Sequence, residues 1–378
     1  MSRKNTPSPV YFWNLRASTK APFELRMRKL LKQSRVASHL NPGDLVALKT
    51  HFGERGTTAF VSPLQLKPIV AFLRKSGVKP FLTDTNTLYV GQRNESVSHA
   101  RLAAEHGFDP MITGAPVIIA DGLKSSNQVS VTSPGHHFEH AYLAGDILDA
   151  DFMISITHFK GHELTGFGGV LKNLGMGCAT RQGKMQQHCS LGPRLNPDRC
   201  THCGECVEVC SPGALFLNED GTMVLDQEAC IGCAACLLTC RHGGLSVDWD
   251  VDVRQFVERM VEYAGAVLSC FAKPLLHIAF VQNVTPGCDC IGYSDAPICP
   301  DQGVLAAYDP VALDSACLDL VNQAPGLSSS RLPLEVQPGT DKFKALHLRS
   351  QPDHCLEYAQ SLGLGSRTYQ LIHIDSRD

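Results

Sequence analysis

Eight of the sixteen cysteines stand in two strings of identical spacing. Each string follows the pattern C-x2-C-x2-C-x3-C, and the second repeats the first thirty residues later at all four positions. The segment is therefore a tandem duplication, in which each half offers three closely spaced sulfurs and one more distant sulfur. The two strings are Cys200, Cys203, Cys206 and Cys210, followed by Cys230, Cys233, Cys236 and Cys240.

This spacing predicts two [4Fe-4S] clusters of the bacterial ferredoxin type, in which the fourth cysteine of each string binds the other cluster. Structural zinc uses two separated pairs of ligands, so a third cysteine in each string would have no use there. Disulfides would need an oxidising compartment, for which no targeting signal is seen. The expected ligand sets are Cys200, Cys203, Cys206 with Cys240, and Cys230, Cys233, Cys236 with Cys210.

A second group of polar residues follows an apolar run at residues 152–157. If the chain stays extended there, alternate side chains share one face. Glycines then precede an apparent helix, and such a strand-to-helix turn is where α/β sheets bind ligands, with the helix start favouring an anion. The alternative is a flexible loop with solvated histidines. We predict catalytic roles for His158, Lys160, His162 and Lys172, and ligand binding at Gly166, Gly168 and Gly169.

Cys288 and Cys290 flank Asp289 and suggest a third metal site. In an extended C-x-C segment the two sulfurs face the same way. With Cys299, or with a histidine of the earlier loop, they could hold zinc or another iron–sulfur unit. The alternative is a pair of partly buried free thiols.

Apolar runs alternating with helical patterns must position these groups. Proline follows a capping residue at Ser62-Pro63 and again at Asp309-Pro310, which predicts two helix starts. The alternation lies on both sides of the cysteine strings, so we expect an α/β domain with a mostly parallel sheet, built from residues 1–190 and 249–378. A small α+β ferredoxin-like insert interrupts it at residues 191–248. The expected strands are residues 10–15, 45–50, 78–83, 116–120, 152–157, 276–281 and 304–307.

The composition limits the kinds of binding partner that we expect. A formal charge of −3 and 43% hydrophobic residues give no reason to expect nucleic acid or a membrane. Residues 191–248 hold 3 basic and 8 acidic residues, net −5, which would steer a basic redox partner protein, although an ordinary solvated face reads the same way. The amino terminus lacks a signal-peptide apolar run, and residues 263–284 fall short of the ~20 clean apolar residues of a membrane span. We expect a cytoplasmic protein.

Apart from the insert, the chain resembles the domain-of-unknown-function family 362. The resemblance rests on HFGERG at residues 51–56, HFKGH at 158–162, GFGGVLKNLGMG at 166–177, and then Arg181, Gly183, Lys184 and His188. Many members of that family carry a two-cluster ferredoxin insert. A shorter stretch resembles the active-site loop of the nickel-pincer lactate racemases. His162, Gly166-Phe167 and Lys172 stand at matching spacing, which implies cofactor attachment at Lys172.

Two functions fit these features. One is an oxidoreductase, in which the clusters deliver single electrons to an anionic small-molecule ligand held over the polar loop, with cations stabilising developing charge and a histidine supplying a proton. The other is a non-enzymatic electron carrier or iron–sulfur scaffold. The convergent polar loop favours the oxidoreductase, because a plain electron carrier has no need of such a loop. No Rossmann or Walker fingerprint is present, so the sequence does not support nucleotide reduction.

Overall fold

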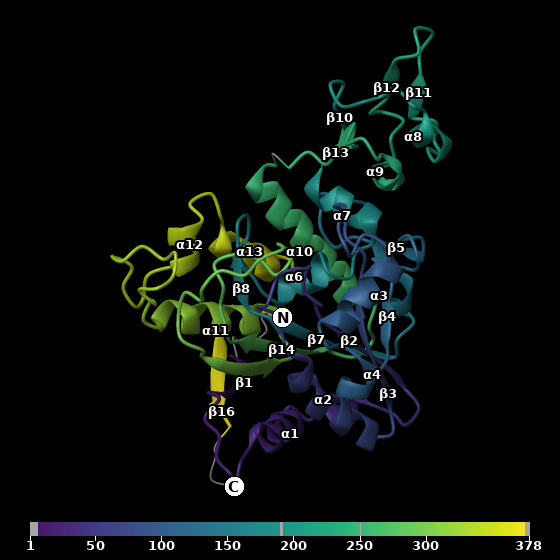
Figure 1. The fold of residues 1–378 in the computed structure, drawn as a ribbon. Coiled ribbons are helices and arrows are strands. Elements are labelled where there is room, and N and C mark those ends of the chain that lie inside the picture. Colours follow the sequence, from purple (N-terminus) through teal and green to yellow (C-terminus); the bar gives the residue numbers. More distant parts are fainter. Residues whose placement is uncertain (1–6, 190–191, 250, 375–378) are drawn as a thin grey trace.

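A computed structural model describes residues 7–189, 192–249 and 251–374, and a central eight-stranded sheet organises it (Figure 1). Strand β15 runs antiparallel to both of its neighbours, β14 and β1, while the other neighbouring pairs are parallel. The mostly parallel α/β fold expected from the sequence is therefore confirmed. In spatial order the strands are β16 (Tyr369–His373), β1 (Ser8–Trp13), β15 (Gly303–Ala307), β14 (Leu276–Val281), β7 (Phe152–His158), β2 (Leu45–Lys49), β3 (Lys79–Asp84) and β4 (Val117–Ile119).

Helices cover both faces of the sheet, which is why β7 and β14 are buried along their whole length. Helices α1 (Phe23–Gln33) and α2 (Pro63–Lys75) lie on one face. On the other face lie α6 (Val170–Gly175), α10 (Val253–Ser269), α11 (Pro310–Gln323) and α13 (Pro352–Ser361). The remaining elements of this domain are η1 (Val36–His39), α3 (Ser96–Glu105), α4 (Pro110–Thr113), α5 (Gly145–Leu148), α7 (Arg181–His188), α12 (Lys342–Leu346), and the hairpins β5 (Gln128–Thr132) with β6 (His140–Ala144) and β8 (Lys160–His162) with β9 (Gly166–Gly168).

The two predicted helix starts are capped as expected. Gln65 Oε1 accepts a hydrogen bond from the Ser62 backbone N–H at 3.2 Å, at the start of α2. Asp309 accepts one from the Ala312 N–H at 2.8 Å, at the start of α11. In both helices proline occupies the first turn, where its missing N–H leaves no intrahelical bond unmade.

The strand order reverses between β2 and β7. From β2 the chain proceeds to β3 and β4 on one side, whereas from β7 it proceeds to β14 on the other. In a parallel sheet the connections leaving two such strands diverge, which opens a crevice at their carboxyl ends. Lys49 and His158 end these two strands, so the predicted polar stretch that begins at His158 lies at the same end of the sheet as Lys49.

The cysteine-rich insert projects from this domain between α7 and α10 (Figure 1). It has its own buried group of side chains, and the antiparallel pair β10 with β13 closes its base. The expected boundary at residues 190 and 191 lies outside the described residues, so the domain limits stay a prediction. The elements of the insert are β10 (Arg194–Leu195), α8 (Glu205–Glu208), β11 (Leu215–Leu217), β12 (Met223–Leu225), α9 (Ala235–Thr239) and β13 (Leu245–Ser246).

Within the part of the chain that the structure describes, no helix has the length and apolar character needed to cross a bilayer.

Candidate functional site

A cavity of about 450 Å³ lies at the switch point between β2 and β7. Its size is that of a site for a small organic molecule. One part of its wall is basic or polar, and another part is apolar. The polar part consists of Lys49, His51, Thr87, Arg93, Lys160, His162, Glu163, Lys172, Asn173, Lys184, His188 and Cys290, so it carries one carboxylate among its basic groups; the apolar part includes Leu88, Tyr89, Leu164, Met176, Trp249, Phe256 and Ile291.

Asn173 joins the two strands that diverge beneath the cavity. Its side-chain N–H₂ donates to the backbone oxygens of Lys49 at 3.3 Å and Ile156 at 3.2 Å. Its side-chain oxygen accepts from Lys49 Nζ at 2.8 Å, and Nζ also lies 2.9 Å from the Asp84 carboxylate. The Lys49 charge is therefore buried but paired, and α6 is tied to both β2 and β7.

Lys172 is the cation best placed to meet a ligand. Among the described residues its ammonium has one hydrogen-bond partner, Cys288 Sγ at 3.0 Å, so two N–H donors remain. Burial alone would lower the pKa of Lys172, but Cys288 and Cys290 outweigh it and raise the pKa. The side chain is therefore charged at neutral pH.

Lys184 adds a second positive charge with no carboxylate in direct contact. Its Nζ donates to Thr85 Oγ1, Asn86 O and Ala179 O at 2.5, 2.7 and 2.7 Å. Burial lowers its pKa to about 8, against the attraction of more distant Asp121 and Asp84. The charge is thus present at neutral pH and is lost in mild alkali.

The cavity histidines are neutral. Burial and nearby Lys172 hold the pKa of His162 well below its ordinary value, and burial lowers that of His188 to about 3. His162 Nδ1 accepts the backbone N–H groups of Leu164 and Thr165, each at 3.3 Å, so Nε2 carries the proton. Among the described residues His188 Nδ1 is buried and has no hydrogen-bond partner, which favours a polar ligand there.

His158 is not among the residues that line the cavity, and its catalytic role stays a prediction. Its Nδ1 lies 2.9 Å from Asp289 Oδ1, and its Nε2 lies 2.8 Å from the Gln282 carbonyl oxygen. Both nitrogens are thus engaged in holding the Asp289 loop against β14. The expected shared face fails because β7 ends at His158 and the next two residues of the pattern, Lys160 and His162, belong to a separate hairpin, β8 with β9.

The glycine turn is shaped by packing against Asp314, and ligand binding at its glycines stays a prediction. Asp314 of α11 accepts the Val170 and Leu171 N–H groups at 2.7 and 2.9 Å, so a carboxylate of the chain already occupies the start of α6. A Cβ at Gly169 would lie 2.3 Å from that carboxylate, and Gly166 has a φ of +83°. Gly169 lines the cavity wall, whereas Gly166 and Gly168 are not among its lining residues.

Cys288 and Cys290 lie beside Lys172, on the side of the cavity near Arg93. A hydrogen bond from Cys290, and then Lys172, hold the pKa of Cys288 well below its ordinary value. Among the described residues no third histidine, cysteine or carboxylate joins both sulfurs within 4.8 Å. Cys299, the suggested third ligand, packs in the hydrophobic core instead. The metal site at this pair stays a prediction.

In the insert, four cysteines line each of two small cavities. These groups match the two crossed ligand sets expected from the spacing, and none of the sixteen cysteines, all of which are described, forms a disulfide. The residues present thus fit a cubane cluster in each cavity, with one soft sulfur ligand for each iron. One cavity is lined by Cys200, Cys203, Cys206 and Cys240, and the other by Cys210, Cys230, Cys233 and Cys236.

The insert packs against the wall of the cavity. Leu88 lines the cavity and also packs, with Met185 of α7, in the buried group of the insert that contains Cys206 of the first set and Cys236 of the second. Gln182 Nε2 of α7 donates to the carbonyl oxygen of Ile231, which follows Cys230 of the second set, at 3.1 Å.

Sequence reasoning assigned no role to several residues of the cavity. Lys49 carried a usable signal, since it ends a predicted strand, and His51, Lys184 and His188 stand within the words that carried the family resemblance. Arg93 had none. It reaches the cavity through a buried pair with Glu54 at 3.2 Å, a contact between residues 39 positions apart.

Fold and site together define an α/β domain with a basic cavity at its switch point and a cysteine-rich, ferredoxin-like insert beside that cavity. The chain belongs to the family described as domain of unknown function (DUF362), which matches residues 46–319.

Three similar proteins add detail. Over 34 residues, 9% of the chain, it is 44% identical to a probable ferredoxin from Methanosarcina thermophila, and the match covers 59% of that ferredoxin. This links the chain to iron–sulfur proteins. Among solved structures, a lactate racemase apoprotein from Thermoanaerobacterium thermosaccharolyticum is 12% identical with a TM-score of 0.38, covering 73% of this chain and 51% of that one. A protein from Thermotoga maritima is 12% identical with a TM-score of 0.37, covering 70% and 52%. The chain thus spans about half the length of these two solved chains.

Proposed function

We propose that this protein is an iron–sulfur oxidoreductase that reduces an anionic small molecule bound in the cavity. The observation that carries the proposal is the shared wall: Leu88 belongs both to the cavity and to the buried group around Cys236. Two [4Fe-4S] clusters, when bound to the eight cysteines, would supply single electrons. The basic wall on the other side supplies the binding charge.

The residues of the chain bind and orient the ligand. Lys172 donates hydrogen bonds to its anionic group, with Lys184 adding charge at longer range. His162 Nε2 donates a further hydrogen bond as the ligand gains negative charge, because its other nitrogen is occupied by backbone N–H groups. Trp249 and Phe256 narrow the cavity with apolar surface, which excludes water and strengthens these interactions.

A redox partner protein would dock on the far side of the insert, at the set containing the exposed Cys203. The insert is acidic, and Glu205 and Glu208 of α8 stand in the same short segment as Cys203 and Cys206. A basic partner is favoured by this charge. The same feature supports the second candidate, a simple electron carrier, but that function leaves the basic cavity and the unpartnered His188 nitrogen without a use.

The test is whether a molecule in the cavity oxidises the reduced clusters. Protein purified without oxygen would be analysed by mass spectrometry for small molecules that remain bound. The clusters would then be reduced and their electron paramagnetic resonance signal followed after the identified molecule is added. We expect the signal to disappear at a rate that depends on the concentration of that molecule. If the signal persists while the molecule is bound, the oxidoreductase proposal is refuted and the electron-carrier function remains.

A further inference from the structure

A cluster of histidine and carboxylate side chains lies on the side of α10 turned away from the cavity. Phe256 of α10 lines the cavity, whereas Glu258 and Glu262 stand roughly opposite it by helical periodicity and one turn apart from each other. The loop at residues 133–139 and helix α13 pack over these two carboxylates. His136 and His137 come from the loop, and His354 comes from α13.

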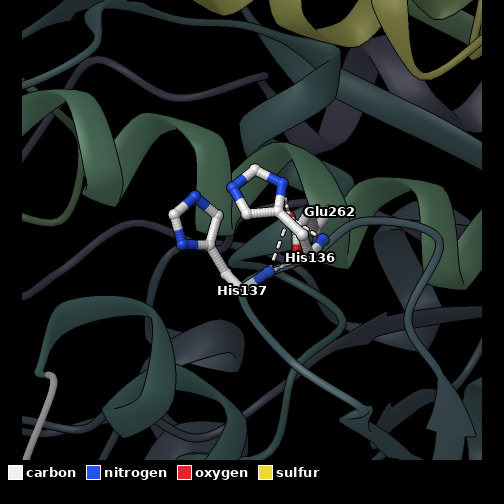
Figure 2. A group of neighbouring side chains, drawn as sticks. All are labelled: His136, His137 and Glu262. Carbon is white, nitrogen blue, oxygen red and sulfur yellow. Dashed lines mark hydrogen bonds and ion pairs between the residues drawn. The ribbon is translucent and has the colours of Figure 1, made fainter.

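The donor atoms of His136, His137 and Glu262 all lie within 4.8 Å of one another, and the described residues contain no second such trio. Figure 2 shows the two imidazole rings beside each other next to the Glu262 carboxylate. The ring centroids are 4.3 Å apart, and His136 Nδ1 is 3.8 Å from Glu262 Oε1. Ligands of a tetrahedral zinc ion with bonds of ~2.0–2.2 Å are about 3.4 Å apart, so small side-chain movements close the site.

The orientation of His137 is the strongest sign of a built site. Its Nε2 lies 2.7 Å from Glu258 Oε2, so this nitrogen donates to a carboxylate and Nδ1 is left as the lone-pair atom. A histidine that binds a metal through one nitrogen and donates to a carboxylate through the other is the usual arrangement in metal sites. Glu258 is held in turn by His354 Nε2 at 2.8 Å.

Glu262 fixes the loop that carries both histidines. Its fully buried carboxylate accepts the backbone N–H of His136 at 2.8 Å and of His137 at 3.1 Å, together with the Tyr358 hydroxyl at 2.8 Å. A Cβ at Gly135 would lie 2.0 Å from this carboxyl carbon, so the loop approaches as closely as it does only because that residue is glycine. The backbone that carries the two imidazoles is thus fixed before any ion arrives.

We propose that His136, His137 and Glu262 bind one divalent transition-metal ion of the zinc type. Two imidazole nitrogens and one carboxylate oxygen suit such an ion, whereas calcium and magnesium require mostly oxygen ligands. Three protein ligands leave a fourth position open, and it faces solvent because the His136 side chain is 71% exposed. Glu258 is a positioning residue, which acts through His137. The site is independent of the iron–sulfur chemistry proposed above.

The test uses full-length protein with its clusters loaded anaerobically, dialysed against Zn²⁺ and analysed for zinc, iron and sulfide. We expect one tightly held zinc ion that is lost in His136→Ala, with iron and sulfide unchanged. His140→Ala is the matched control, because His140 lies four residues on, is 47% exposed and is not in the trio; it should retain the zinc. Glu258→Gln should weaken zinc binding by roughly 10–100-fold.

X-ray absorption at the zinc edge distinguishes zinc bound at this site from zinc bound by cysteines. Nitrogen and oxygen ligands lie at ~2.0–2.2 Å from zinc, and sulfur ligands at ~2.3 Å. A shell of nitrogen and oxygen supports the proposal. A sulfur shell, zinc retention in His136→Ala equal to the parent protein, or no zinc bound by the parent protein would each overturn it.

Discussion

Replacing Lys172 by methionine should remove most of the affinity of the cavity for its anion while leaving the insert intact. Methionine keeps much of the length and apolar volume of the lysine stem but lacks the ammonium that lies 3.0 Å from Cys288 Sγ and lines the cavity. A hydrogen bond to a charged group contributes about 1.5–3 kcal/mol, which corresponds to a loss of roughly 10- to 150-fold in affinity. The upper part of this range applies here, because the ammonium is buried in a cavity with apolar walls.

The measurement compares the amount of bound small molecule per chain after identical anaerobic purification, together with iron and sulfide content. Lys342→Met is a matched control. Lys342 is also a buried lysine, but its ammonium donates to the backbone oxygen of Asn322 at 2.7 Å and it lies outside the cavity. The Lys342→Met protein should be less stable than the parent protein but should retain the same amount of ligand. Equal retention of ligand in Lys172→Met and the parent protein would refute a role for Lys172.

Three further predictions follow from the same geometry. Anaerobic analysis should find about eight irons and eight acid-labile sulfides per chain, since the two cysteine sets need no ligand from elsewhere, whereas about two zinc ions without sulfide would exclude the clusters. Anion affinity should fall as pH rises through about 8, because burial lowers the pKa of Lys184 to that value and the folded protein then loses this charge; a titration of Lys184→Met should lack the step. If Cys288 and Cys290 bind metal, Cys288→Ser should lower total metal while the signals of both reduced clusters persist; unchanged metal leaves the two residues as ordinary thiols.

The sequence predicted those features that depend on local pattern. The strands emerged from mostly apolar runs, and the boundaries of β14 were those expected, because a strand buried on both faces is apolar along most of its length. The cysteine sets also came from spacing alone, since three ligands in a tight loop need no knowledge of the fold. Lys160 and His162 line the cavity from the hairpin that follows β7, and Lys172 lines it from α6, the next helix of the chain.

The features that the sequence did not predict depend on contacts between distant segments. The start of α6, where an anion was expected, is occupied by Asp314, which lies 144 residues from Val170. His158 is paired with Asp289, 131 residues away. A helix start favours an anion, and a histidine pairs readily with a carboxylate. In both cases the group that takes this place is a carboxylate of the chain itself rather than a ligand.

The place of the insert within the domain explains how the clusters that would supply electrons lie next to the cavity that would bind the ligand. The segment that enters the insert begins at the end of α7, where His188 lines the cavity, and the segment that leaves it carries Trp249 before α10 supplies Phe256. The His188 ring contacts both of the others, with ring centroids 4.8 Å from Trp249 and 4.8 Å from Phe256. Both ends of the insert therefore form part of the cavity wall. Trp249 directly follows the insert, so a movement of the insert that carried Trp249 with it would change both its contact with His188 and the cavity wall.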